Sequence, residues 1–234
     1  MNLSPLADNA LPLADAVVTV ADWMRSRSIA LPSDLAANIQ AVKTQAYFQR
    51  ALWDYTRKFH GGTMDVSTFL DKFIVLVEDQ ARRAWNEGMR NVGLDPAQIT
   101  INQRAHLQEI INREFNHVLD YASAIEDLKK EGKPVDQLRA RCDLWANRYP
   151  NIVNEAMAYC APHDRYRWQY GDTVQHCSTC AAMNGIVATG VQWRASGILP
   201  QSPPNPRLEC GGWRCRCQLV PTTDPLTETG IPAV

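Results

Sequence analysis

The sequence lacks any long apolar segment and any excess of charge of one sign. No apolar run reaches the roughly 18 residues that a membrane-spanning helix needs, so no membrane partner is expected. The 24 Lys and Arg residues are balanced by 25 Asp and Glu residues, which gives a formal net charge of -1. Because nucleic-acid-binding domains are usually strongly basic, this balance does not indicate wholesale binding of nucleic acid.

The sequence also lacks the short motifs of several common enzyme classes. It contains no G-x-x-x-x-G-K-[ST], G-x-G-x-x-G, H-E-x-x-H or G-x-S-x-G pattern, which mark phosphate-binding, dinucleotide-binding, zinc-protease and hydrolase sites. The adjacent acids Glu78-Asp79 and Glu126-Asp127 diverge around their predicted helices, so we interpret both pairs as solvated faces. The sequence therefore predicts no enzyme activity and no small-molecule substrate.

A basic segment is missing before the first apolar run, Ala16–Ala21, which Asp8 and Asp15 precede instead. A secretory signal peptide begins with a basic region, so we expect the chain to fold in an intracellular, reducing environment. Under those conditions clustered cysteines bind metal more often than they form disulfides.

Apolar residues recurring every three or four positions predict a mainly α-helical body over residues 33–161. Helices are expected at 33–59, from Asp65 to Gly93, from Asp95-Pro96 to Gly132, over 135–149, and from a break at Pro150-Asn151 to about Cys160. The stripes on two of them are Phe69, Phe73, Leu76, Val77, Ala81, Ala84 and Trp85, and Leu107, Ile111, Val118, Ala122 and Ile125.

Residues 1–32 are predicted to form an N-terminal arm, with a short helix near Asp15–Arg27. The arm carries Leu3, Leu6, Leu11, Leu13, Val17, Val18, Val20 and Trp23 without a strong partner pattern. Exposed apolar surface is costly in water, so the arm either packs on a partner or another copy, or folds back on the helical body.

The composition changes near Pro162. No lysine follows Lys133, whereas glycine and proline become frequent. We predict a small α+β, turn-rich cysteine module over 162–221, with strands near 166–170, 185–189 and 218–220, and a C-terminal tail over 222–234. A module of this size with little apolar surface to bury usually needs a cross-link, such as a disulfide or a structural metal, to be stable.

Five of the seven cysteines lie in this module. Cys177 and Cys180 form C-x-x-C, and Cys210, Cys215 and Cys217 form C-x4-C-x-C about thirty residues later. Zinc in structural sites prefers four tetrahedral ligands, most often thiolates. The spacing therefore predicts one structural zinc, bound by the first pair and by two of the last three cysteines.

Alternatives to this zinc site remain open. A disulfide between the two cysteine arms, or free packed thiols, would use the same residues. His163 and His176 are reserve ligands, and Cys142 and Cys160 lie in helical segments as expected core thiols.

Arginines and aromatic residues accompany the cysteines. Between positions 163 and 220 there are six arginines and three acids (Asp164, Asp172 and Glu209), a local excess of +3 that would offset a zinc–thiolate centre of about -2. The arginines are Arg165, Arg167, Arg194, Arg207, Arg214 and Arg216, and the aromatic residues beside them are Tyr166, Trp168, Trp193 and Trp213. These aromatic rings either form a small core around the metal or stack on nucleic-acid bases.

The hypothesis that the chain is an enzyme has weaker support. Cys177 with His163 or His176 could form a cysteine–histidine pair, and Asp164 with Asp172 could begin a nuclease site, but further carboxylates are not evident nearby. A metal-dependent enzyme is therefore the least favoured alternative.

The cysteine module resembles the phage Mu F-like head morphogenesis proteins over residues 165–221. The matching segments are Trp168–Thr173, His176–Gly185, Gln192-Trp193, Gly197–Pro200 and Leu208–Pro221. The family pattern is C-x-x-C-A-x-x-[ND]-G, a proline-rich stretch and C-R-C-x-L-x-P. Many members carry His-Pro-Asn before the last motif, where this chain has Gly212-Trp213-Arg214, so Cys210 is the candidate replacement for the family's histidine.

The resemblance implies a minor capsid or head morphogenesis protein of a tailed phage or prophage. Its expected partners are the portal protein and the major capsid protein, with phage DNA as a further candidate. The expected location is the virion head, and the bacterial host cytoplasm during assembly. The main alternative is a zinc-stabilised nucleic-acid-binding module that acts in DNA packaging or ejection.

Overall fold

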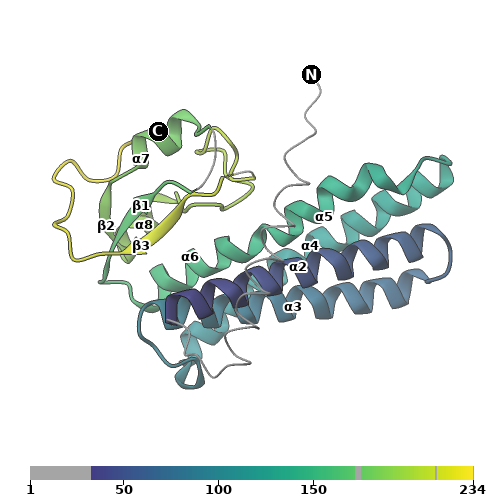
Figure 1. The fold of residues 1–234 in the computed structure, drawn as a ribbon, viewed down its shortest axis with the longest axis horizontal. Coiled ribbons are helices and arrows are strands. Elements are labelled where there is room, and N and C mark those ends of the chain that lie inside the picture. The colour runs from purple at the N-terminus through teal and green to yellow at the C-terminus, as the bar shows by residue number, and fades with distance from the viewer. Residues whose placement is uncertain (1–32, 172–174, 214, 234) are drawn as a thin grey trace.

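The computed structural model describes residues 33–171, 175–213 and 215–233, with side chains from residue 44 onward. The N-terminal arm, including the helix expected near Asp15–Arg27, lies outside this range. The larger part is a bundle of long helices with short 3₁₀ turns: α2 (Ser33–His60), α3 (Val66–Asn91), η1 (Pro96–Gln98), α4 (Ile101–Lys130), η2 (Val135–Leu138), α5 (Arg139–Ala146) and α6 (Arg148–Cys160). The smaller part contains β1 (Arg165–Gln169), α7 (Ser178–Met183), β2 (Val187–Thr189), α8 (Gly190–Ser196) and β3 (Gln218–Pro221) (Figure 1).

The predicted fold class, a helical body followed by a small α+β cysteine-rich region, is confirmed. All three predicted strands are present, and β1 lies between β2 and β3 with antiparallel pairing on both sides. No helix in the ranges given above is long and apolar enough to cross a membrane.

Local capping explains where the long helices begin. The carboxylate of Asp65 accepts a 2.8 Å hydrogen bond from the backbone N–H of Thr68, so the predicted start of α3 is confirmed. Asp95 caps only the 3₁₀ turn η1, and the predicted start of the next helix was several residues too early. Helix α4 begins after Thr100, which forms a reciprocal capping box with Gln103.

The expected break at Pro150 is also wrong. The predicted helix over 135–149 is instead the 3₁₀ turn η2 followed by α5, and the boundary with α6 lies at Asn147. Pro150 falls in the first turn of α6. A proline is tolerated there because the N–H groups of the first turn have no helical acceptor.

The two predicted apolar stripes are buried along their whole length, as expected. Helices α3 and α6 approach closely at Gly88, where an added Cβ would lie 2.5 Å from the Cβ of Ala156. At the other end of the bundle, the rings of Phe73 and Tyr121 pack edge to face, with centroids 5.7 Å apart. The first contact holds α6, which leads into the cysteine-rich region, against α3, and the second joins α3 to α4.

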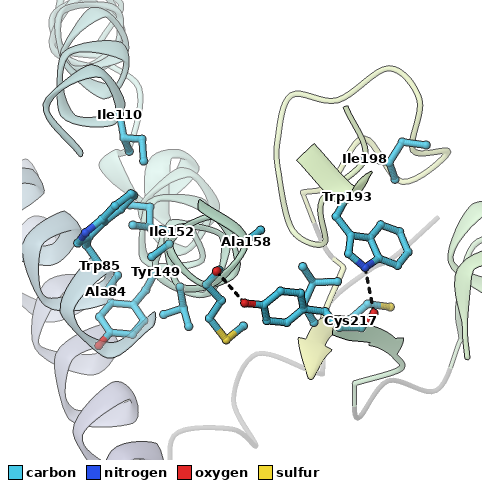
Figure 2. Close-up of a cluster of buried hydrophobic side chains, with 14 of the residues drawn as sticks. Ala84, Trp85, Ile110, Tyr149, Ile152, Ala158, Trp193, Ile198 and Cys217 are labelled. Atoms are coloured by element: carbon cyan, nitrogen blue, oxygen red, sulfur yellow. Dashed lines mark hydrogen bonds between the residues drawn. The ribbon is translucent and has the colours of Figure 1, made fainter. Parts of the chain in front are cut away.

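One hydrophobic cluster contains side chains from both parts of the molecule. Figure 2 shows it continuing from Trp85 and Tyr149 in the bundle, past Ala158 of α6, to Trp193 and Cys217. The expectation of little apolar surface in the cysteine module was wrong, since the side chains of Tyr166, Trp168 and Trp193 are all fully buried. The module therefore packs on α6 through a shared core, and its position relative to the bundle is fixed.

Candidate metal centre

The first cysteine arm lies at the N-terminus of the short helix α7. Cys177 is the N-cap residue, and its sulfur accepts a 3.4 Å hydrogen bond from the backbone N–H of Cys180. This turn aims both sulfurs to the same side. The arm is tied to the second arm by Glu209, whose carboxylate accepts hydrogen bonds from the Ser178 backbone N–H (2.7 Å) and hydroxyl (2.6 Å).

The second arm brings Cys210, Cys215 and Cys217 to the same place. Gly211 and Gly212 follow Cys210 with φ angles of 61° and 79°, a left-handed conformation that favours glycine. The backbone N–H of Cys217 donates a 3.4 Å hydrogen bond to the sulfur of Cys215. The tight turn at the glycines returns the chain toward Cys177 and Cys180.

The five sulfurs form two overlapping groups of three. One group is Cys177, Cys180 and Cys210, and the other is Cys180, Cys215 and Cys217; within each group the sulfurs all lie within 4.8 Å of one another. Cys180 belongs to both groups, and its sulfur lies 3.6 Å from that of Cys215. All five cysteines are free thiols, and each group could hold a metal ion.

The surroundings of Cys217 favour a negatively charged sulfur. Hydrogen bonds from the thiols of Cys180 and Cys215 lower the pKa of Cys217 and outweigh the effect of its burial, and the nearby Trp168 indole and Gly171 backbone N–H groups act in the same direction. The Trp168 Nε1–H is buried beside Cys217 and has no hydrogen-bond partner of ordinary geometry among the residues described. A buried N–H facing a sulfur fits a metal-bound thiolate, whose charge such donors stabilise.

Gly171 is required by the close approach of two chain segments. A Cβ at this position would lie 1.9 Å from the carbonyl oxygen of Arg216. The absence of a side chain allows the Gly171 N–H to reach Cys217. Sequence reasoning missed this role and the position of the Trp168 N–H beside Cys217, because both depend on contacts between segments almost fifty residues apart.

The reserve histidines are not members of either sulfur group within the described ranges. His176 stacks on Tyr170 with ring centroids 3.7 Å apart, and His163 is exposed. Cys142 is a buried core thiol, 2.9 Å from the Tyr121 hydroxyl, as expected. Burial raises the pKa of the half-buried Cys160 to about 12.

The acid pairs have ordinary partners. Arg82 and Arg83 bind Glu78 and Asp79 at 2.6 and 2.8 Å on the solvent side of α3. Asp164 is exposed, and Asp172, the other half of the nuclease pair considered above, lies outside the described residues.

Three of the four aromatic residues considered for base stacking are core residues. Tyr166, Trp168 and Trp193 are fully buried, whereas Trp213 is 39% exposed. Trp213 lines a cavity of about 140 Å³ between the bundle and the cysteine-rich region, together with Arg141 and Arg148. Only this one ring of the four is exposed enough to contact a partner.

Comparisons of the chain with protein-family profiles, with curated proteins and with solved structures gave no match. The site is therefore interpreted from its own chemistry.

Proposed function

We propose that the protein is a minor capsid or head morphogenesis protein of a tailed phage or prophage, with a structural role in head assembly. The observation that supports this most strongly is the convergence of two cysteine arms on one cluster beside a rigid helical bundle. The same cysteines carry the sequence resemblance to Mu F-like proteins. A module that is cross-linked by metal and held on a helical bundle by a shared core is rigid, as a structural protein requires.

Zinc is the proposed metal because the donors are all sulfur. Cys177, Cys180, Cys210, Cys215 and Cys217 offer soft ligands, and thiolate sites of this type select zinc among the common divalent ions. When bound, zinc supplies a cross-link between the two arms. The chain supplies N–H donors that stabilise the thiolates and the core that holds α7 and β3 on α6.

The portal protein and the major capsid protein are the proposed partners, in the host cytoplasm during assembly and then in the virion head. The bundle, with the apolar arm at residues 1–32, is proposed as the docking element, and the cysteine module as a fixed platform. No catalytic role is proposed, since the clustered cysteines are better suited to binding metal than to catalysis.

Co-purification from induced or infected cells tests this proposal. The tagged full chain should be recovered with portal and capsid proteins, and deletion of residues 2–30 should leave a soluble, folded protein that no longer enters heads. Recovery without either partner would overturn the head-assembly role. Normal incorporation of the deletion variant would assign docking to the bundle or the module.

DNA binding is the alternative, and exposed Trp213 near Arg141 is the observation that favours it. Binding to DNA through phosphate contacts weakens steeply with salt. An affinity that falls steeply as salt rises and is lost in Trp213→Ala would support this alternative, whereas no binding at low salt would exclude it.

A further inference from the structure

We propose that the five cysteines bind two zinc ions that share the thiolate of Cys180. The inference deepens the proposed zinc binding and rests on it. It concerns the number of ions and the role of each sulfur. The sequence spacing alone predicted one ion bound by four of the five sulfurs.

The arrangement of the sulfurs is two triangles joined at one corner. Cys177, Cys180 and Cys210 form the first triangle, and Cys180, Cys215 and Cys217 form the second. In a tetrahedral zinc site with bonds of about 2.3 Å, all four sulfurs lie about 3.8 Å apart. Within the described residues, no set of four sulfurs is mutually close, so two three-sulfur sites fit the geometry better than one four-sulfur site.

The hydrogen bonds to sulfur follow the same division. Two of the four outer sulfurs accept 3.4 Å hydrogen bonds from backbone N–H groups, Cys177 from Cys180 and Cys215 from Cys217. The backbone N–H groups of Gly212 and Gly171 lie beside the other two, Cys210 and Cys217. Among the residues described, the sulfur of Cys180 has other thiols as its hydrogen-bond partners.

This difference is expected of a bridging ligand. A thiolate bound to one metal keeps lone pairs and charge that attract N–H donors, whereas a thiolate between two metals has given up more of both. Cys180 is also 2% exposed, which protects the shared sulfur from solvent. Cys177, Cys210 and Cys215 are partly exposed, so solvent can reach both ions to complete a four-coordinate shell.

Charge balance is compatible with two ions. Five thiolates with two divalent cations sum to a formal charge of about -1, compared with about -2 for one ion bound by four thiolates. Burying the smaller net charge in a partly buried site costs less free energy.

Counting zinc in the full-length protein tests the inference. The protein is loaded with excess zinc under a non-thiol reductant, desalted and measured by native mass spectrometry. We expect two zinc ions per chain. One ion would overturn the shared-sulfur arrangement but keep the proposed zinc module, and no bound zinc would contradict the proposed function itself.

Three variants locate the shared sulfur. Cys210→Ser and Cys217→Ser each break one triangle and should retain one tightly bound zinc. Cys180→Ser breaks both and should retain none under the same conditions. Retention of one or more zinc ions by Cys180→Ser would overturn the bridging role, and circular dichroism of the helical bundle checks that each variant is folded.

Discussion

The guanidinium of Arg148 in α6 and the carboxylate of Glu114 in α4 form a two-pronged ion pair, with hydrogen bonds of 2.8 and 2.7 Å. Their side chains are 7% and 4% exposed, respectively. Arg148 also donates to the carbonyl of Pro203, in the loop that leads to Cys210. The same guanidinium therefore connects the bundle to the cysteine-rich region.

Glu114→Ala leaves this buried cation without its partner. Breaking a buried pair in this way costs about 3–5 kcal/mol, and we expect a loss of that size in the free energy of unfolding measured with urea. Asp79→Ala, which removes the exposed partner of Arg83, is the control and should cost less than about 1 kcal/mol. Equal effects of the two changes would contradict a structural role for the buried pair.

Trp168→Phe removes the indole N–H beside Cys217 and keeps most of the buried ring. Loss of a group that supports a metal ligand from outside typically weakens metal affinity by about 10–100-fold, and a competition titration with a zinc chelator should detect this. Trp193→Phe is the matched control, because its Nε1 donates to the Tyr166 carbonyl at 3.0 Å. The donor role would be excluded if both variants bound zinc as the wild type does.

Gly171→Ala places a methyl group where the Arg216 carbonyl lies. The two segments must separate, so the Gly171 N–H is drawn away from Cys217 and zinc binding weakens. Gly185→Ala is a useful comparison, since its φ of 87° carries backbone strain but nothing lies within 4 Å of the added Cβ. We expect metal loss during gel filtration only for the first variant; retention of full zinc by Gly171→Ala would count against the contact.

The stability of the fold should depend on the ionisation of Glu87. Burial raises the pKa of this carboxyl above 4.5, although the Tyr149 hydroxyl, 2.7 Å away, donates to it and opposes the shift. A raised pKa in the folded state means that folding favours the protonated form. The contribution of Glu87 to the free energy of unfolding is therefore complete below pH 4.5 and is lost as the pH rises through the folded-state pKa.

Urea unfolding of the wild type and of Glu87→Gln across this range measures the effect. The neutral glutamine does not titrate, so the stability difference between the two proteins should change in favour of the variant as the pH rises above 4.5. A difference that stays constant with pH would contradict the assignment.

Periodicity predicted the helices well, because each buried stripe is encoded locally. The seven apolar positions from Phe69 to Trp85 share one face whatever the partner is. Helix starts were less predictable: Asp95-Pro96 and Thr100 are both good start signals, and only the second has the reciprocal partner, Gln103. Pro150 was misread because a proline that ends one helix and a proline in the first turn of the next look alike in sequence.

The cysteine spacing indicated that the two arms meet. It did not indicate that the five sulfurs form two groups of three that share Cys180. That division depends on Glu209 joining the arms, on Gly171 passing over Arg216, and on the shared core that holds β1 against α6. These are contacts between distant segments, and no local pattern encodes them. The fully buried Trp193 likewise contributes to a core that the turn-rich composition did not predict.

The most direct test of the account is amide hydrogen exchange of the zinc-loaded protein, under reducing conditions, with and without a strong chelator. A structural metal contributes folding free energy to the region that holds it. Chelation should therefore remove the protection of α7 and β3 and weaken that of α6 near Ala158, while the aromatic core around Phe73 and Tyr121 stays protected. Unchanged exchange in α7 and β3 after chelation would contradict a metal-stabilised module.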